Sequence, residues 1–279
     1  MLVTMKEILD KAKEGHYAVA APNVDNEHNL RACIEAAEEL NSPIIIGVPI
    51  HSNPNPDICY FGRIMQDIAI RASVPVAINL DHGGSYDECV MGIRAGFTSI
   101  MVDRSKLSFE ENVAEVKELV KVAHAVNVSV EAELGHVGGG ETYAVDGYEN
   151  LTEPDQAAKY VEETGVDCLA VAIGTAHGFY KGEPFIRFEL LEEIAKKVSV
   201  PLVLHGGSGT GDENLAKAAK LGICKVNLSI DLRQAAIDEL NSADLTGYGL
   251  YGFYKYIAKG YKDKLSHYIR ILGSEGKAW

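Results

Sequence analysis

The sequence predicts a (βα)8 barrel, or TIM barrel, in which all 279 residues form a single domain with a C-terminal helical extension. Two observations predict it: short runs rich in Val, Ile, Leu and Ala recur along the chain, and amphipathic segments separate them. Eight such runs occur, roughly 20 to 40 residues apart, which leaves room for one crossover helix each time. The competing architecture is an open doubly wound sheet, but no GxGxxG motif follows the first run and no break divides the chain into halves.

Each expected element follows from local composition. The expected strands are 17–21, 43–48, 75–80, 99–102, 129–132, 168–173, 201–204 and 225–228. Apolar residues at helical spacing predict helices over 27–40, 108–126, 154–164, 188–198 and 212–221, with helix-starting residues at Asn26, Ser85, Ser108, Thr152 and Asp212. The aperiodic segment 241–252 is expected to be a loop before a final helix over 253–271.

The composition excludes several classes of protein. With 47% hydrophobic and 24% charged residues the chain is typical of a globular protein, and a net charge of −14 disfavours nucleic acid or an anionic membrane as a partner. The first 15 residues are rich in charge and no apolar run approaches the roughly 18 residues of a membrane span, so we expect a cytoplasmic protein. Its five scattered cysteines include no CxxC pair, which indicates reduced thiols.

Polar side chains gather where the predicted strands end, which is the active-site face of a barrel. These residues are Asn23, Asp81, His82, Asp103, Glu131, Glu133, His177, His205, Asn227 and Ser229. Three imidazoles with an open fourth position are a common catalytic zinc site, so His82, His177 and His205 are the predicted ligands. His51 and His136 follow the second and fifth strands and are candidates for lining the same pocket.

A glycine-rich loop after the seventh strand predicts an anion site. Gly206, Gly207 and Ser208 precede a helix, and Asn227 and Ser229 end the eighth strand, where barrels frequently bind phosphate through backbone N–H groups. Local N–H donors bind an anion even on an acidic protein.

Four motifs carry a resemblance to a known family. They are NLDHG at 79–83, VEAELG at 130–135, GTAHG at 174–178 and PLVLHGGSG at 201–209. In these motifs and their order the chain resembles the class II, zinc-dependent ketose-phosphate aldolases, which include fructose-bisphosphate and tagatose-bisphosphate aldolases. The resemblance extends from about residue 6 to the GSEGK tail at 273–277.

The resemblance implies a role for individual residues. It places the catalytic zinc ligands on His82, His177 and His205, in agreement with the choice made from the strand ends. Asp103 and Glu133 match a second metal position, although either could instead orient a histidine. Asp81 matches the proton donor to the aldehyde oxygen, and Glu141 matches the acid that exchanges the proton on the donor substrate. The implied phosphate positions, where a Na⁺ or K⁺ ion often sits too, are Gly178, Gly206, Gly207, Ser208, Asn227 and Ser229; Asn23 joins them as a substrate-binding candidate.

The implied activity belongs to carbohydrate metabolism. It is a lyase reaction, the reversible cleavage of a ketose 1-phosphate or ketose 1,6-bisphosphate to dihydroxyacetone phosphate and an aldehyde, in a homodimer or homotetramer. A zinc hydrolase on the same barrel is an alternative, but such sites commonly carry His-x-His on the first strand, which here has no histidine. The second alternative is a non-catalytic barrel that binds a sugar phosphate. Asp81 and Glu141 argue against it, because binding alone requires neither residue.

The chain departs from the family pattern at several positions, and those after the first and second strands affect the acceptor pocket. Proline at 49 replaces a serine near the second strand, and Pro22, Asn79, His136 and Ile230 also differ from the usual residues. Loss of one hydroxyl contact at Ile230, of order 1 kcal/mol, is tolerable for phosphate binding. We therefore expect an aldehyde other than glyceraldehyde 3-phosphate.

Overall fold

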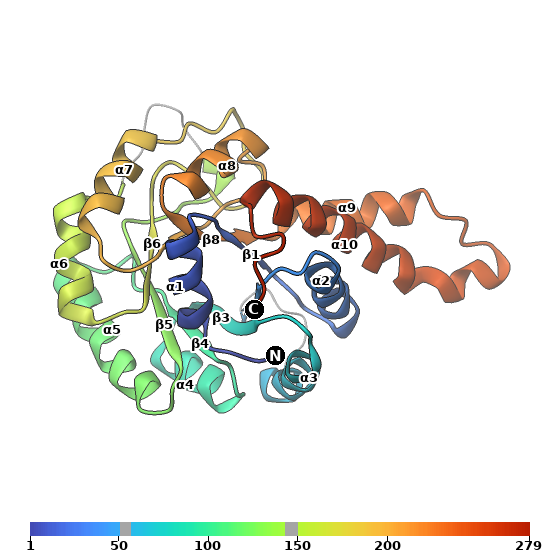
Figure 1. Ribbon diagram of the computed structural model, residues 1–279, viewed down its shortest axis with the longest axis horizontal. Coiled ribbons are helices and arrows are strands. Elements are labelled where there is room, and N and C mark those ends of the chain that lie inside the picture. The colour runs from blue at the N-terminus through green and yellow to red at the C-terminus, as the bar shows by residue number, and fades with distance from the viewer. Residues whose placement is uncertain (51–56, 143–149) are drawn as a thin grey trace.

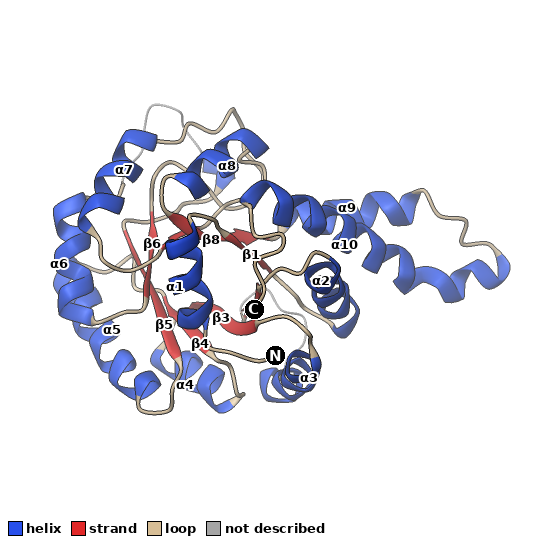
Figure 2. Cartoon of the chain, viewed as in Figure 1, coloured by secondary structure: helices blue, strands red, loops and turns tan. Residues whose placement is uncertain are grey.

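Eight parallel strands wind into a nearly closed barrel surrounded by helices (Figures 1 and 2). The structure is a computed structural model that describes residues 1–50, 57–142 and 150–279. The strands are β1 (Val19–Pro22), β2 (Ile44–Pro49), β3 (Val76–Gly83), β4 (Ser99–Val102), β5 (Ser129–Leu134), β6 (Cys168–Val171), β7 (Leu202–Leu204) and β8 (Ile223–Leu228). This architecture confirms the TIM barrel predicted from the recurring apolar runs.

Hydrogen bonds join the strands in the order β1-β8-β7-β6-β5-β4-β3-β2. The remaining gap, between β1 and β2, is bridged where Asn23 pairs with Gly47 and the Val24 N–H donates to the Gly47 carbonyl at 2.9 Å. Because every pair is parallel, the carboxyl ends of all eight strands meet at one rim.

Helices follow the strands around the barrel. They are α1 (Met5–Gly15), α2 (Glu27–Glu39), α3 (Ile58–Arg71), α4 (Tyr86–Arg94), α5 (Phe109–His124), α6 (Pro154–Thr164), α7 (Phe188–Lys197), α8 (Asp212–Lys220), α9 (Ile230–Asn241) and α10 (Phe253–Leu272), with short 3₁₀ turns η1 (Gly140–Thr142) and η2 (Gly247–Gly252). No helix within the described ranges is long and apolar enough to cross a bilayer.

Two apolar cores hold the fold together. The larger fills the space between the strands and the outer helices. The smaller lies inside the barrel, where Met5, Ile8 and Leu9 of α1 pack against inward-facing residues such as Met101 and Val203. Helix α1 thus covers the end of the barrel opposite the rim, as its position across the opening in Figure 1 shows.

Three of the five predicted helix starts are confirmed. Asn26, Ser85 and Ser108 each accept a hydrogen bond from a backbone N–H in the first turn of α2, α4 and α5. The other two were displaced by one residue, since Glu153 caps α6 and Gly211 precedes α8. The Thr152 hydroxyl donates to the Leu134 carbonyl and accepts from the Ala172 N–H at 2.8 Å, which ties the ends of β5 and β6 together.

Helices α9 and α10 form an arm that projects from the barrel (Figure 1). The predicted loop at 241–252 is confirmed for residues 242–246, since residue 241 ends α9 and the chain forms η2 after residue 246. The five cysteines are all free thiols, as expected, and four are buried.

The close approach of α9 and α10 generates a stability prediction. A Cβ atom at Gly260 would lie 2.3 Å from the Ala235 carbonyl oxygen, so Gly260→Ala must push the two helices apart. We expect urea unfolding to show that the free energy of unfolding of this variant is lower by about 1 to 3 kcal/mol. An unfolding free energy unchanged within about 0.5 kcal/mol would show that the arm is loosely packed.

Candidate metal centre and active site

A distortion at the end of β3 brings two adjacent side chains to the rim. His82 has a φ of +52°, and the pairing of β3 with β4 shifts register between Leu80 and Gly83. In a regular strand Asp81 and His82 would point to opposite faces, but an irregular strand end re-aims one of them. A positive φ is costly for a residue with a Cβ, and such strain is concentrated at functional sites.

The three predicted zinc ligands meet at this rim. The ring centroid of His82 lies 5.0 Å from that of His177 and 4.7 Å from that of His205, and the third separation is 5.7 Å. One nitrogen from each ring falls within 4.8 Å of the other two. The arrangement has the donor type, ligand number and spacing of a three-histidine zinc site.

A buried nitrogen without a partner supports the fit of a metal. His205 is fully buried, its Nε2 is bonded to Glu131 Oε1 at 2.8 Å, and its Nδ1 has no hydrogen-bond partner among the described residues. An orphaned buried nitrogen is costly unless something binds it. A zinc ion held by the three rings would satisfy Nδ1.

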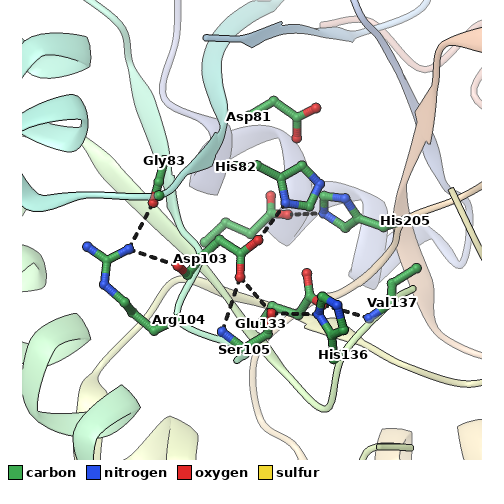
Figure 3. Close-up of polar contacts among 12 residues, drawn as sticks. Asp81, His82, Gly83, Asp103, Arg104, Ser105, Glu133, His136, Val137 and His205 are labelled. Carbon is green, nitrogen blue, oxygen red and sulfur yellow. Dashed lines mark hydrogen bonds and ion pairs between the residues drawn. The ribbon is translucent and has the colours of Figure 1, made fainter. Parts of the chain in front are cut away.

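Asp103 and Glu133 lie beside His82 but differ in what they offer a metal (Figure 3). Asp103 Oδ2 is 2.8 Å from His82 Nδ1, and its Oδ1 accepts from the Ser105 N–H and hydroxyl. Both Asp103 oxygens are therefore engaged, which suits a group that orients His82. Glu133 Oε1 accepts from the Val137 N–H, whereas its buried Oε2 has no partner in the part of the chain that the structure describes, so Glu133 has an oxygen available for a metal.

The sequence left the role of His136 open, and the structure places it in the larger cavity beside the triad. Its Nδ1 is 2.9 Å from the Ser105 hydroxyl oxygen and 3.6 Å from Glu133 Oε1. The cavity has a volume of about 860 Å³ and is also lined by His82 and His177. His51 lies outside the described residues.

The histidines titrate differently in the metal-free chain. Burial and the neighbouring rings of His205 and His82 lower the pKa of His177 to about 3, so its ring is neutral. Burial lowers the pKa of His82 as well, but the charge of Asp81 and the hydrogen bond to Asp103 more than offset this and raise it to about 9. A metal must therefore displace a proton from His82 before that ring can bind it.

The predicted phosphate residues line a second cavity of about 230 Å³ that also contacts His82 and His177. Its walls include all the predicted substrate positions, namely Asn23, Gly178, Gly206, Gly207, Ser208, Asn227 and Ser229. The Ser208 oxygen accepts from the backbone N–H groups of Ser229 and Asp231, which leaves its own hydrogen for a ligand anion. The cavity is thus a small polar cradle beside the histidines.

Asp81 and Asn227 form one wall of the cradle. The Asn227 amide donates to Asp81 Oδ1 at 2.8 Å, and both side chains are almost fully buried. This bond fixes the carboxylate and leaves its second oxygen for a substrate group.

Glu141 is the predicted residue that the structure leaves apart from the others. It lies on η1 with an exposed side chain, outside the groups of clustered metal-binding side chains among the described residues. The loop before it is tied to the triad, since the His177 N–H donates to the Gly138 carbonyl and the Gly140 N–H donates to the His177 carbonyl.

Comparison with known proteins shows the family of the chain. The sequence model described as fructose-bisphosphate aldolase class-II matches residues 3–277. The chain belongs to the class II fructose-bisphosphate aldolase family. It is 41% identical to a fructose-bisphosphate aldolase of Geobacillus stearothermophilus over 288 residues and 39% identical to one of Staphylococcus aureus over 285, each alignment covering 99% of both chains. The crystal structure of the YdjI aldolase from Escherichia coli K12 superposes with a TM-score of 0.89 at 37% identity and full coverage of both chains.

The protein is therefore an aldolase, a carbon–carbon lyase, and the two alternatives weighed from the sequence fall away. Sequence reasoning assigned no role to two polar residues below the candidate metal centre, Glu131 and Lys225. Lys225 lies early in β8, away from the rim, and its buried side chain pairs with Glu131.

The raised pKa of His82 generates a prediction for the aldolase. Below about pH 9 the ring of His82 is protonated, so zinc binding at pH 7.5 should release about one proton from it, and the apparent zinc affinity should rise with pH up to that point. Calorimetric titration of zinc in buffers of different ionisation enthalpy measures the number of protons. The His124→Ala variant, altered at a remote histidine that pairs with Asp167, should release the same number. Zinc binding without proton release would contradict this prediction.

Proposed function

We propose that this aldolase catalyses the zinc-dependent, reversible cleavage of a ketose 1-phosphate or ketose 1,6-bisphosphate to dihydroxyacetone phosphate and an aldehyde. The observation that carries the proposal is the position of the three-histidine cluster between two cavities, one of which is the polar cradle. A phosphate in the cradle would hold the carbonyl end of a sugar beside the histidines.

His82, His177 and His205 would hold the zinc ion, with Glu133 available at a second position. When bound, zinc supplies Lewis-acid chemistry, polarising a carbonyl and stabilising negative charge on its oxygen. A Schiff-base mechanism would need an accessible amine, whereas the amine of Lys225 is buried and paired with Glu131.

The cradle would bind the phosphate of the donor through the Ser208 hydroxyl and backbone N–H groups around Gly178, Gly206 and Gly207. We extend the proposal to a Na⁺ or K⁺ ion beside that phosphate. The amide oxygens of Asn23 and Asn227 favour this extension, since both are buried without a hydrogen-bond partner in residues 1–50, 57–142 and 150–279, and oxygen ligands suit such ions.

Two carboxylates would move the protons. Burial raises the pKa of Asp81, but the charge of His82 more than offsets this and holds it at about 2. Asp81 is thus ionised and ready to take the proton of the sugar hydroxyl during cleavage, and it would return that proton to the aldehyde oxygen during condensation. Glu141 would add and remove the proton on the donor carbon, and its loop is anchored to His177 for that task.

The acceptor side favours an aldehyde other than glyceraldehyde 3-phosphate. Pro49 stands opposite Asp81 in the register of β2 and β3, and both line the cradle cavity. Proline offers no hydroxyl to a sugar at this position. We therefore propose a ketose 1-phosphate or a less usual bisphosphate as the natural substrate, and a homodimer or homotetramer as the working assembly.

The proposed roles of Asp81 and Glu141 can be separated. Asp81→Asn should lower kcat for cleavage by about 10² to 10⁴-fold, because the amide cannot accept the hydroxyl proton. The same variant should still exchange a proton of dihydroxyacetone phosphate with solvent, whereas Glu141→Gln should lose both activities. Proton NMR in D₂O measures the exchange. Full cleavage activity in Asp81→Asn would refute the role of Asp81.

The substrate proposal is tested with a panel of ketose 1-phosphates and ketose 1,6-bisphosphates. Release of dihydroxyacetone phosphate from the zinc-loaded aldolase, measured by a coupled assay, should give the highest kcat/KM for a sugar other than fructose 1,6-bisphosphate. A clear preference for fructose 1,6-bisphosphate would overturn the acceptor proposal and leave the aldolase assignment intact.

A further inference from the structure

A buried ion pair lies directly beneath the metal centre and takes no part in the mechanism above. Glu131 on β5 and Lys225 on β8 are both fully buried inside the barrel. Lys225 Nζ is 2.5 Å from Glu131 Oε2, and the other oxygen, Oε1, is 2.8 Å from His205 Nε2. Lys225 thus contacts Glu131, and Glu131 in turn contacts His205, a proposed zinc ligand.

The bond from Glu131 decides which nitrogen of His205 carries the proton. An ionised carboxylate only accepts hydrogen bonds, so the Nε2 of His205 must be the protonated nitrogen. Its Nδ1 then carries a lone pair, and this buried atom contacts no hydrogen-bond partner within the described part of the chain. The opposite tautomer would place a hydrogen on Nδ1 and prevent that atom from binding a metal.

Lys225 keeps Glu131 in the form that this bond requires. The ammonium group of Lys225 pairs with Oε2 of Glu131, so the buried carboxylate has a counter-charge in direct contact. A buried ion pair adds little net stability compared with apolar packing, so stability alone does not account for a lysine inside the barrel.

We infer that Glu131 and Lys225 are positioning residues that fix the tautomer and orientation of His205 for metal binding. This inference rests on the proposed zinc site. The carboxylate aligns the ring through Nε2, and the lysine supplies the counter-charge. Orienting partners of this kind typically change metal affinity by about 10 to 100-fold.

The first test is the tautomer of His205 in the full-length, chelator-treated protein, read from ¹⁵N chemical shifts of the histidine ring. We expect the Nε2–H form in the parent. The amide of Glu131→Gln can donate to Nε2 as well as accept from it, so part of the population should move to the Nδ1–H form. A parent protein with His205 in the Nδ1–H form would overturn the inference without any variant.

The second test is zinc affinity, measured by competition with a chromophoric chelator. Glu131→Gln should weaken zinc binding about 10 to 100-fold. The double variant Glu131→Gln/Lys225→Met leaves no unpaired charge in the barrel, so it keeps the test valid if the single variant does not fold. It should show a similar loss of zinc affinity. The matched control is Asp167→Asn, at a site away from the rim. It removes a carboxylate whose Oδ2 lies 2.9 Å from His124 Nε2, and this variant should bind zinc as the parent does.

Two outcomes of the zinc experiment would overturn the inference. One is parental zinc affinity in both Glu131 variants with an unchanged tautomer. The other is an equal loss in Asp167→Asn, which would indicate a general effect of removing a buried carboxylate. Failure of this inference can be distinguished from failure of the proposed function, because the tautomer of His205 is measured without metal or substrate.

Discussion

Three imidazole rings crowded into one buried rim are the constraint on which the active site depends. Burial and this crowding lower the pKa of His177, because protonated rings this close repel each other, and each ring needs a defined orientation to bind a metal. Asp103 aligns His82 and Glu131 aligns His205, each through a hydrogen bond of 2.8 Å. The barrel supplies the rigid strands that hold these acids, and α1 closes the opposite end.

A protein of net charge −14 binds an anionic sugar by confining its donors to one place. The cradle next to the histidines offers the Ser208 hydroxyl and backbone N–H groups, which carry partial charge without adding a basic surface. Because the cradle and the larger cavity both contact His82 and His177, the phosphate and the reacting carbons of one substrate can lie on either side of the same centre.

Much of the fold and of the candidate site could be predicted from the sequence. The spacing of the apolar runs indicates the (βα)8 pattern, and that pattern places all strand ends at one rim. The three histidines and the cradle followed from that placement alone. The roles of Asp81 and Glu141 came only from the resemblance to the aldolases. The left-handed conformation of His82 had no signal, since nothing local distinguishes it from a regular strand end.

Lys225 illustrates a second limit of sequence reasoning. Its place early in β8 excluded it from the rim, but a lysine side chain is long enough to reach Glu131 on a strand distant in the sequence. Such a contact depends on how strands lie across the barrel interior, which periodicity does not determine. Buried charge at an inward-facing strand position is the signal that would have found it.

The most direct test of the central claim is an activity titration with zinc. Chelator-treated protein should release no dihydroxyacetone phosphate from its best ketose phosphate substrate, and activity should return in proportion to added zinc until about one ion per chain is bound. Undiminished cleavage after complete removal of metal would contradict the account of the three histidines.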